Sequence, residues 1–159
     1  MAKLKKTNAA RILDQHKINY SLVPYQVDEN DLSCVHVAAQ LGEDISQVFK
    51  TLVLKGDKTN YFVCVIPGNE SINLKLAAKI SGNKKCDLIP MKDLLGITGY
   101  IRGGCTPIGM KKQFPTYFHD SVLLHPFIYI SAGIRGLQIK VNPKDLFKLI
   151  QIVTAPIID

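Results

Sequence analysis

The chain is 159 residues long, of which 47% are hydrophobic and 21% charged. These proportions are typical of a globular protein and exclude a disordered chain. Twenty Lys and Arg against 13 Asp and Glu give a formal net charge of +7 at pH 7, which favours a polyanionic partner, although a solvated basic surface has the same composition. The basic residues 1–6 are not followed by an apolar signal-peptide core, and no apolar run approaches the ~18 residues of a membrane span. We therefore expect a cytoplasmic protein without a membrane partner.

Capping residues and apolar periodicity divide the first half of the chain into short elements. Thr7 can cap a helix whose apolar residues recur at helical spacing, and Gly42 can end a second helix. Runs rich in β-branched residues on both sides of Gly56 and Asp57 predict a hairpin. The predicted elements are a helix over 7–17, a strand over 18–24, a helix over 35–41, and strands over 48–55 and 61–66.

The second half mixes helices with strands in the same way. Asn73 and Asn142 are suited to cap helices, and Pro143 fits a first helical position. The predicted elements are helices over 73–80 and 91–95, a shaped loop over 102–109, strands over 122–124, 127–131 and 137–141, and a helix over 142–150. Because no linker or repeat interrupts them, we expect a single α+β domain over 1–159, compact, around a central mixed and largely antiparallel sheet flanked by helices.

The cysteines and histidines show no C-x-x-C pair and no H-E-x-x-H motif. We therefore predict reduced thiols, no metal and no cofactor. Cys64 lies in an apolar run and is predicted to pack as a small core residue, whereas Cys105 lies in a glycine-rich loop. The residues concerned are Cys34, Cys64, Cys86, Cys105, His16, His36, His119 and His125.

Lys50 is the first candidate site residue. Strand alternation places it on the same face as Leu52 and Leu54, so that a cation stands among apolar side chains. A lysine at a strand end can simply extend its ammonium into water. The functional interpretation, kept open beside that one, is a cation on a cleft wall that binds a phosphate or a carboxylate.

Two glycine-rich segments are further candidates. In 103–109 the backbone can approach a ligand closely and offer N–H donors to a carbonyl, although a tight connection has the same composition. Segment 131–136 is a small-residue turn between two strands, which by itself indicates a bulged connection. The first segment lacks the G-K-[ST] of a phosphate-binding P-loop. No G-x-S-x-G or Ser, His and Asp arrangement supports a hydrolase triad.

Taken together, the sequences V-F-K-T-L at 48–52, G-G-C-T-P-I-G-M-K-K at 103–112 and Y-I-S-A-G-I-R-G-L at 129–137 resemble the YbaK/EbsC family of freestanding aminoacyl-tRNA deacylases. The resemblance is specific because the three motifs occur in order, at family-like spacing, over nearly the whole chain. It implies a barrel-like sheet and a cleft between the lysine strand, the glycine loop and the Ser-Gly turn. The form of the loop suggests the branch that acts on Cys-tRNA(Pro) in trans, after the synthetase has released its product.

The resemblance also implies a role for each matching residue. Lys50 would place the phosphate at the 3′-terminal adenosine of the CCA end, and the backbone of Gly103 and Gly104 would hold the aminoacyl carbonyl. The substrate's own thiol would attack the ester, so that the protein supplies position and polarisation in place of a nucleophile. The substrate-binding residues expected on this basis are Tyr20 on the pocket wall, Pro107, Ser131, Gly133 and Gln138.

Two positions depart from the family pattern. Gln138 stands where many relatives carry an acidic residue, which removes a charge that would orient the substrate's amino group. Cys105 replaces an aliphatic residue of the loop, which suggests either simple packing or thiol sensitivity, and we prefer packing. The first departure bears on the amino acid that is removed.

Several functions therefore stay open from the sequence. The leading one is removal of cysteine from Cys-tRNA(Pro), with Cys-tRNA(Cys) as a further substrate and prolyl-tRNA synthetase as a further partner. A deacylase for Ala-tRNA(Pro) or another small amino acid would use water in place of the thiol. A noncatalytic tRNA-binding module would keep Lys50 without turnover. A binder of small phosphates or nucleotides would leave the other motifs unexplained.

Overall fold

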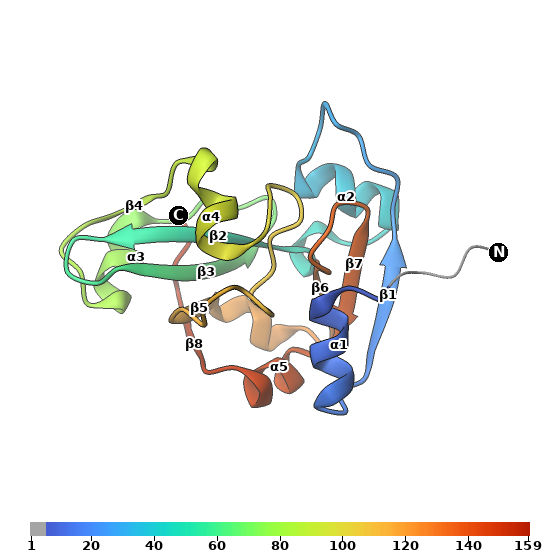
Figure 1. The fold of residues 1–159 in the computed structure, drawn as a ribbon. Coiled ribbons are helices and arrows are strands. Elements are labelled where there is room, and N and C mark those ends of the chain that lie inside the picture. Colours follow the sequence, from blue (N-terminus) through green and yellow to red (C-terminus); the bar gives the residue numbers. More distant parts are fainter. Residues whose placement is uncertain (1–5) are drawn as a thin grey trace.

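The computed structural model describes residues 6–159, so residues 1–5 of the basic N-terminal stretch lie outside the described residues. The strands form two sheets, with helices packed around them (Figure 1). The helices are α1 (Asn8–Gln15), α2 (Cys34–Leu41), α3 (Leu74–Ser81), α4 (Leu94–Thr98) and α5 (Pro143–Leu149). The strands are β1 (Tyr20–Pro24), β2 (Phe49–Gly56), β3 (Tyr61–Pro67), β4 (Cys86–Leu88), β5 (Thr116–His119), β6 (Ile128–Ser131), β7 (Leu137–Val141) and β8 (Ile152–Ala155).

The helices begin and end where their capping residues permit. The side chains of Thr7, Asn73 and Asn142 each accept a hydrogen bond from a backbone N–H in the first turn of α1, α3 and α5. Gly42 and Gly82 end α2 and α3 in the left-handed conformation, at φ 68° and 81°. The caps predicted at Thr7, Gly42, Asn73 and Asn142 are confirmed.

The two sheets differ in strand direction. The smaller sheet, in the order β1-β7-β6, is antiparallel. The larger sheet, in the order β4-β2-β3-β5-β8, is antiparallel up to β3 and parallel from β3 to β8. A parallel bridge between Val48 and Tyr129 connects the start of β2 to β6.

The α+β class and the mixed sheet are confirmed, but the barrel-like arrangement needs a correction. Over residues 6–159 the strands make two sheets that do not close into a barrel. The physical reason is that β1 and β6 remain edges of the smaller sheet, while β4 and β8 remain edges of the larger one.

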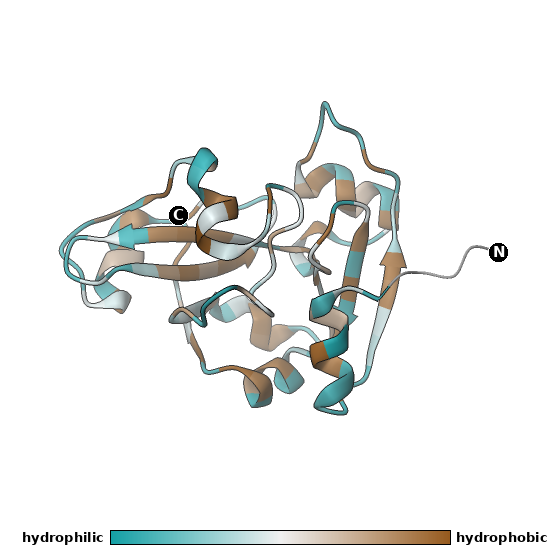
Figure 2. Cartoon of the chain, viewed as in Figure 1, coloured by the Kyte–Doolittle hydropathy of each residue, from teal (hydrophilic) through white to brown (hydrophobic). Residues whose placement is uncertain are grey.

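Strand β2 separates two hydrophobic cores because its side chains alternate. Phe49 and Val53 pack into the larger core, which α1 and the smaller sheet share, whereas Leu54 packs into a second core that includes residues of α3. Leu52 packs against that second core. Figure 2 shows the apolar colour concentrated along the central strands. The alternation predicted for this strand is confirmed.

The weakest predictions concern short elements. Strands β4, β5 and β8, of three or four residues, were not predicted. The strand predicted over 122–124 is wrong, because this stretch belongs to the 3₁₀ helix Asp120–Leu124. That helix buries Val122 and leaves Leu124 80% exposed, so the apolar run does not mark a buried strand. The helix predicted over 91–95 is a 3₁₀ turn, Met91–Asp93, that leads into α4.

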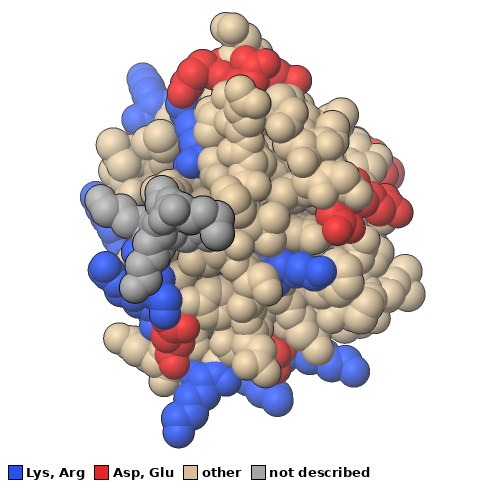
Figure 3. All heavy atoms as spheres, turned by 90° about the vertical axis from the view of Figure 1, so that its right-hand side faces the viewer, with Lys and Arg blue, Asp and Glu red and all other residues tan. Residues whose placement is uncertain are grey.

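Charge is unevenly distributed over the surface. On the face that Figure 3 presents, acidic side chains gather toward the top and the right edge, whereas most Lys and Arg lie along the left edge and the base. In the part of the chain that the structure describes, no helix is both long and apolar enough to cross a bilayer. Nor does any group of three or more His, Cys, Asp or Glu within residues 6–159 come together as a metal site.

Candidate functional site

A cavity of about 430 Å³ lies where β2, the start of α2, the glycine loop and the β6–β7 pair meet. It brings together Lys50, Gly103, Ser131 and Gln138, which the sequence motifs singled out separately. Leu88, Ile89, Met91 and Leu94 line it on the side of β4 and α4. Its wall within the described residues contains no histidine and no carboxylate, and therefore no ordinary general base.

Lys50 enters the cavity wall from the start of β2 and is half-buried. Its ammonium has no ion pair or hydrogen bond to any residue between 6 and 159. Burial raises the pKa of the neighbouring Cys34 thiol, and the positive charge of Lys50 opposes that rise. A cation held against a cavity wall in this way is available to an anionic ligand.

The glycine loop contributes Gly103, which is half-buried and has a left-handed φ of 84°. Its N–H donates to no acceptor within the described residues. Gly104 differs, because it is buried, is absent from the cavity wall and donates its N–H to the Ile101 carbonyl at 2.9 Å. The expectation that both amides hold a substrate carbonyl is therefore corrected, since only that of Gly103 is free to donate.

Close packing explains the glycine at 104. A Cβ there would lie 3.2 Å from the Cα of Ile134, a backbone atom that cannot move aside cheaply. We expect Gly104→Val to lower the free energy of unfolding by about 1–3 kcal/mol, because it forces apart the loop and the 131–136 turn. Gly96→Ala is the matched control: a Cβ there meets nothing within 4 Å, and alanine in this helix should add about 0.5–1 kcal/mol. Urea unfolding measures both, and an unchanged Gly104→Val protein would contradict this account.

The β6–β7 turn supplies the polar end of the cavity. Ser131 and Gln138 are direct partners in the antiparallel register and both line the wall. Ser131 Oγ accepts the N–H of Gly133 at 3.1 Å, which fixes the turn. Gln138 is 5% exposed, and its Oε1 is buried without a hydrogen-bond partner in the described residues. An unpartnered buried acceptor costs about 1–3 kcal/mol, so a donor from a ligand would be stabilised there.

Arg135 fastens the turn to the glycine loop. Its Nε donates to the carbonyl of Arg102 at 2.8 Å, and its Nη1 donates to the Glu29 carboxylate at 2.9 Å. Gly103 packs against the same side chain, 3.2 Å separating its hypothetical Cβ from Arg135 Cγ. The arginine thus joins three segments that are distant in sequence and holds Gly103 at the cavity.

Three of the expected substrate-binding residues do not line the cavity. Tyr20 lies on β1, which β7 separates from β6, and its hydroxyl donates to Asp14 at 2.9 Å. Its expected place on the pocket wall is therefore corrected. Pro107 is buried inside the loop, and Gly133, at φ 104°, packs against the Tyr100 ring. These two residues shape the segments that carry Gly103 and Ser131.

The cavity wall includes two thiols and one cation that the sequence did not assign to it. Cys34 reaches the wall from the start of α2, and Arg102 and Cys105 reach it from the glycine loop. The Cys105 side chain packs against the larger core, as preferred from the sequence, and burial raises the pKa of its thiol to about 12. Ser33 caps the helix that carries Cys34, a signal that was not used, and no local signal predicts that Cys34 lies at the cavity.

The fold and the cavity together define a class of editing domain. Residues 28–149 match the family model described as the aminoacyl-tRNA editing domain. Among solved structures, hypothetical protein APE2540 has a TM-score of 0.85 at 20% identity, with 94% of this chain and 97% of that chain covered. A protein described as a putative trans-editing enzyme for prolyl tRNA synthetase has a TM-score of 0.80 at 20% identity, with 96% and 98% covered. At this identity the two structures support the fold alone.

The chain belongs to the aminoacyl-tRNA editing domain family, and its resemblance to the YbaK/EbsC group is confirmed. It is 49% identical over 152 residues to the Enterococcus faecalis protein named "Putative Cys-tRNA(Pro)/Cys-tRNA(Cys) deacylase EbsC", with 94% of this chain and 93% of that relative covered. It is also 27% identical over 119 residues to "Uncharacterized protein YwhH" of Bacillus subtilis, with 74% and 75% covered.

Proposed function

We propose that this chain is a trans-editing deacylase that removes cysteine from Cys-tRNA(Pro) and also from Cys-tRNA(Cys). The observation that carries the proposal is a cavity with an unpaired cation, Lys50, and a free amide donor, Gly103, but no histidine or carboxylate on its described wall. Such a site suits a substrate that brings its own nucleophile. The 49% identity to the EbsC protein supports the same substrate class.

In this proposal the tRNA end is held at three points. The phosphate at the terminal adenosine pairs with the Lys50 ammonium, since a flexible cation suits a phosphate. The ester carbonyl accepts the Gly103 N–H, and the substrate's α-ammonium donates to the unpaired Oε1 of Gln138 beside Ser131. The neutral amide of Gln138 accepts this hydrogen bond without forming an ion pair. Gln138 would thus orient the ammonium in place of the acidic residue that many relatives carry.

The proposed reaction needs only the substrate's own thiol and ester and the Gly103 N–H. The cysteine sulfur forms a bond to the ester carbonyl carbon, the bond from that carbon to the 3′ oxygen breaks, and the thiol proton ends on that oxygen. Deacylated tRNA and a thiolactone leave, and water opens the thiolactone to cysteine. The Gly103 N–H stabilises the oxyanion, and the fixed geometry replaces a stronger nucleophile.

Release of labelled amino acid tests the proposal. Limiting protein should clear the label from Cys-tRNA(Pro) and Cys-tRNA(Cys) and leave Ala-tRNA(Pro) charged. Loss of alanine instead would replace the thiol mechanism with attack by water. Binding of all three tRNAs without release of any amino acid would identify a noncatalytic module. Addition of prolyl-tRNA synthetase to the same assay tests whether the two proteins act together.

Gln138 offers a test in which stability and activity move in opposite directions. Gln138→Met removes the unpaired buried oxygen, so the free energy of unfolding should stay equal or rise by up to about 1 kcal/mol. The same change should lower kcat/KM for Cys-tRNA(Pro) about tenfold, because the α-ammonium loses its acceptor. Gln151→Met, at an exposed position between α5 and β8, is the control. Full activity in Gln138→Met would exclude this role for the amide.

A further inference from the structure

A second cavity, of about 370 Å³, lies next to the first along β4. Leu88 and Ile89 line both cavities, so the two are neighbours. The walls of the second cavity differ in character from those of the first, because they include Lys55, Tyr61 and Lys85. We call these three residues and the depression between them the hairpin groove.

Strand register places the hairpin groove on the same face of the larger sheet as part of the first cavity. Lys55 lies opposite Tyr61 of β3 and opposite Asp87 of β4, and residues paired across antiparallel strands share a face. Alternation along β2 puts Val53, which lines the first cavity, on that face as well. The step from Val53 to Lys55 is only about 7 Å along the strand. The Val53 side of the first cavity therefore adjoins the hairpin groove, whereas Lys50 stands on the opposite face of β2.

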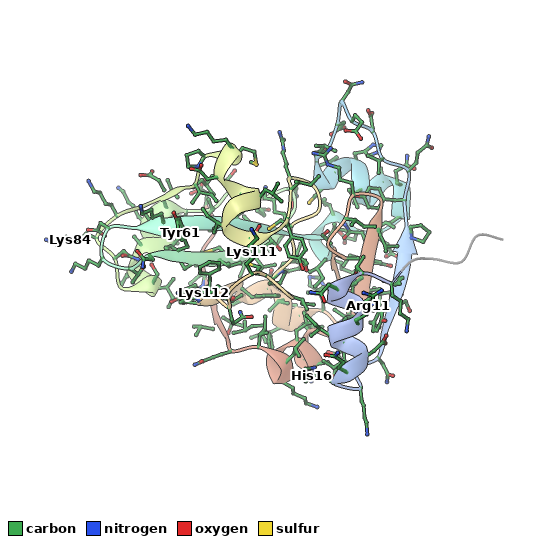
Figure 4. The ribbon with its side chains drawn as sticks, viewed as in Figure 1. Arg11, His16, Tyr61, Lys84, Lys111 and Lys112 are labelled. Atoms are coloured by element: carbon green, nitrogen blue, oxygen red, sulfur yellow. The ribbon has the colours of Figure 1, made fainter. Side chains whose placement is uncertain are left out.

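The hairpin groove combines an aromatic ring with cations. The Tyr61 ring is half-buried and forms a T-shaped pair with Phe114, with centroids 6.0 Å apart, and the Lys55 ammonium lies 5.7 Å from the Tyr61 centroid. Lys85 is exposed, and its backbone N–H donates to the Asp57 carboxylate, which holds the lysine at the groove. In Figure 4, Tyr61 and Lys84 lie on the same end of the molecule, away from α1.

Three carboxylates also line the groove, against its two lysines, and one of the three is engaged by backbone N–H groups. Asp57 accepts the backbone N–H groups of Lys84 and Lys85, while Asp87 and Asp93 are exposed at the rim. An aromatic platform flanked by lysines is how many proteins hold single-stranded nucleic acid without reading its sequence. A duplex would not present an unstacked base to the ring, so the groove favours a single strand.

We propose that the hairpin groove binds the single-stranded nucleotides that precede the terminal adenosine of an aminoacyl-tRNA. One base stacks on Tyr61, and the neighbouring phosphates meet Lys55 and Lys85, while the adenosine and its amino acid occupy the first cavity. This inference rests on the proposed function, because it continues the same substrate out of the Lys50 site. It assigns the recognition of the tRNA end to a surface that is separate from the chemistry.

The test compares three cysteine esters of increasing length: cysteinyl adenosine, a cysteinyl CCA trinucleotide and full Cys-tRNA(Pro). Tyr61→Leu and Lys85→Glu should raise KM for the two longer substrates roughly 5- to 150-fold and leave cysteinyl adenosine unchanged. Tyr61→Phe should behave as wild type because it keeps the ring. Lys144→Glu makes the same charge change at an exposed site on α5, far from β4 in Figure 1, and should have no effect.

Three results would overturn the inference. The first is an equal rise in KM on all three substrates, which indicates damage to the fold or to the Lys50 cavity. The second is an unchanged KM on every substrate. The third is a rise in KM on the full tRNA alone, which indicates contact with the duplex stem. Binding of a labelled single strand that ends in CCA and carries no amino acid is a separate measurement. If the wild-type protein released no cysteine, the proposed function would fail, and this measurement would still decide the inference: Tyr61→Leu must weaken the binding, and equal affinity would refute it.

Discussion

Blocking the substrate's thiol should slow release by about three orders of magnitude. S-methylcysteinyl-tRNA(Pro) is expected to lose its amino acid about 10³-fold more slowly than Cys-tRNA(Pro), well within what intramolecular attack contributes. A thioether cannot attack the carbonyl and give up a proton. No histidine or carboxylate on the described cavity wall is placed to activate water in its stead.

Single-turnover release with excess protein measures this difference without the influence of product release. Ser-tRNA(Pro) and Ala-tRNA(Pro) separate size from nucleophilicity, because both side chains are small enough to enter where cysteine enters. Both should be released slowly. Equal rates for cysteine and S-methylcysteine would mean that water attacks, and the cavity would then need a base that lies outside its described wall.

Lys50→Ala has the second-largest expected effect. Loss of a charged contact to phosphate should raise the activation free energy with Cys-tRNA(Pro) by about 1.5–3 kcal/mol. This change lowers kcat/KM roughly 10- to 150-fold. Stability should change little, because Lys50 is half-exposed and makes no ion pair with any described residue. Lys50→Arg should recover part of the loss, since it keeps the charge but changes the geometry of the donor.

The salt dependence of the rate distinguishes a phosphate contact from a packing role. The wild-type kcat/KM should fall as the salt concentration rises. A plot of log kcat/KM against log salt should be less steep for Lys50→Ala, by the contribution of one phosphate contact. Lys144→Ala, which removes an equal charge from an exposed position on α5, is the control and should keep the activity. An unchanged kcat/KM in Lys50→Ala would support the alternative, in which Lys50 simply extends its ammonium into water at a strand end.

Elements with a local signal were predictable from the sequence, and those that depend on distant partners were not. The cap at Thr7 defines α1, and the runs on both sides of Gly56 define the β2–β3 hairpin. By contrast, β5 is four residues long and lies in the sheet because it pairs in parallel with β3 and β8. Nothing within its own sequence indicates those partners. The same holds for the division into two sheets, which follows from edges that no motif predicts.

The same contrast between local signals and distant partners holds for the residues of the site. Lys50, Gly103, Ser131 and Gln138 line one cavity, and the sequence could single them out because each stands on or next to a well-marked segment. The contribution of Cys34 was not predicted, since it depends on tertiary packing against Gly68, where a Cβ would overlap the thiol side chain. The engagement of the Gly104 amide by a turn could not be predicted either, because it depends on a backbone angle and not on composition.

The most direct test of the central claim is a crystal structure with a stable substrate analogue, 5′-phosphoadenosine that carries cysteine through a 3′ amide. The account predicts the analogue in the Lys50 cavity, with its phosphate in ion-pair contact with Lys50 Nζ. Its carbonyl oxygen should lie about 2.9 Å from the Gly103 nitrogen, and its ammonium at Gln138 Oε1. A bound analogue that leaves Lys50 and Gly103 without contact would contradict the account, whatever the protein's activity.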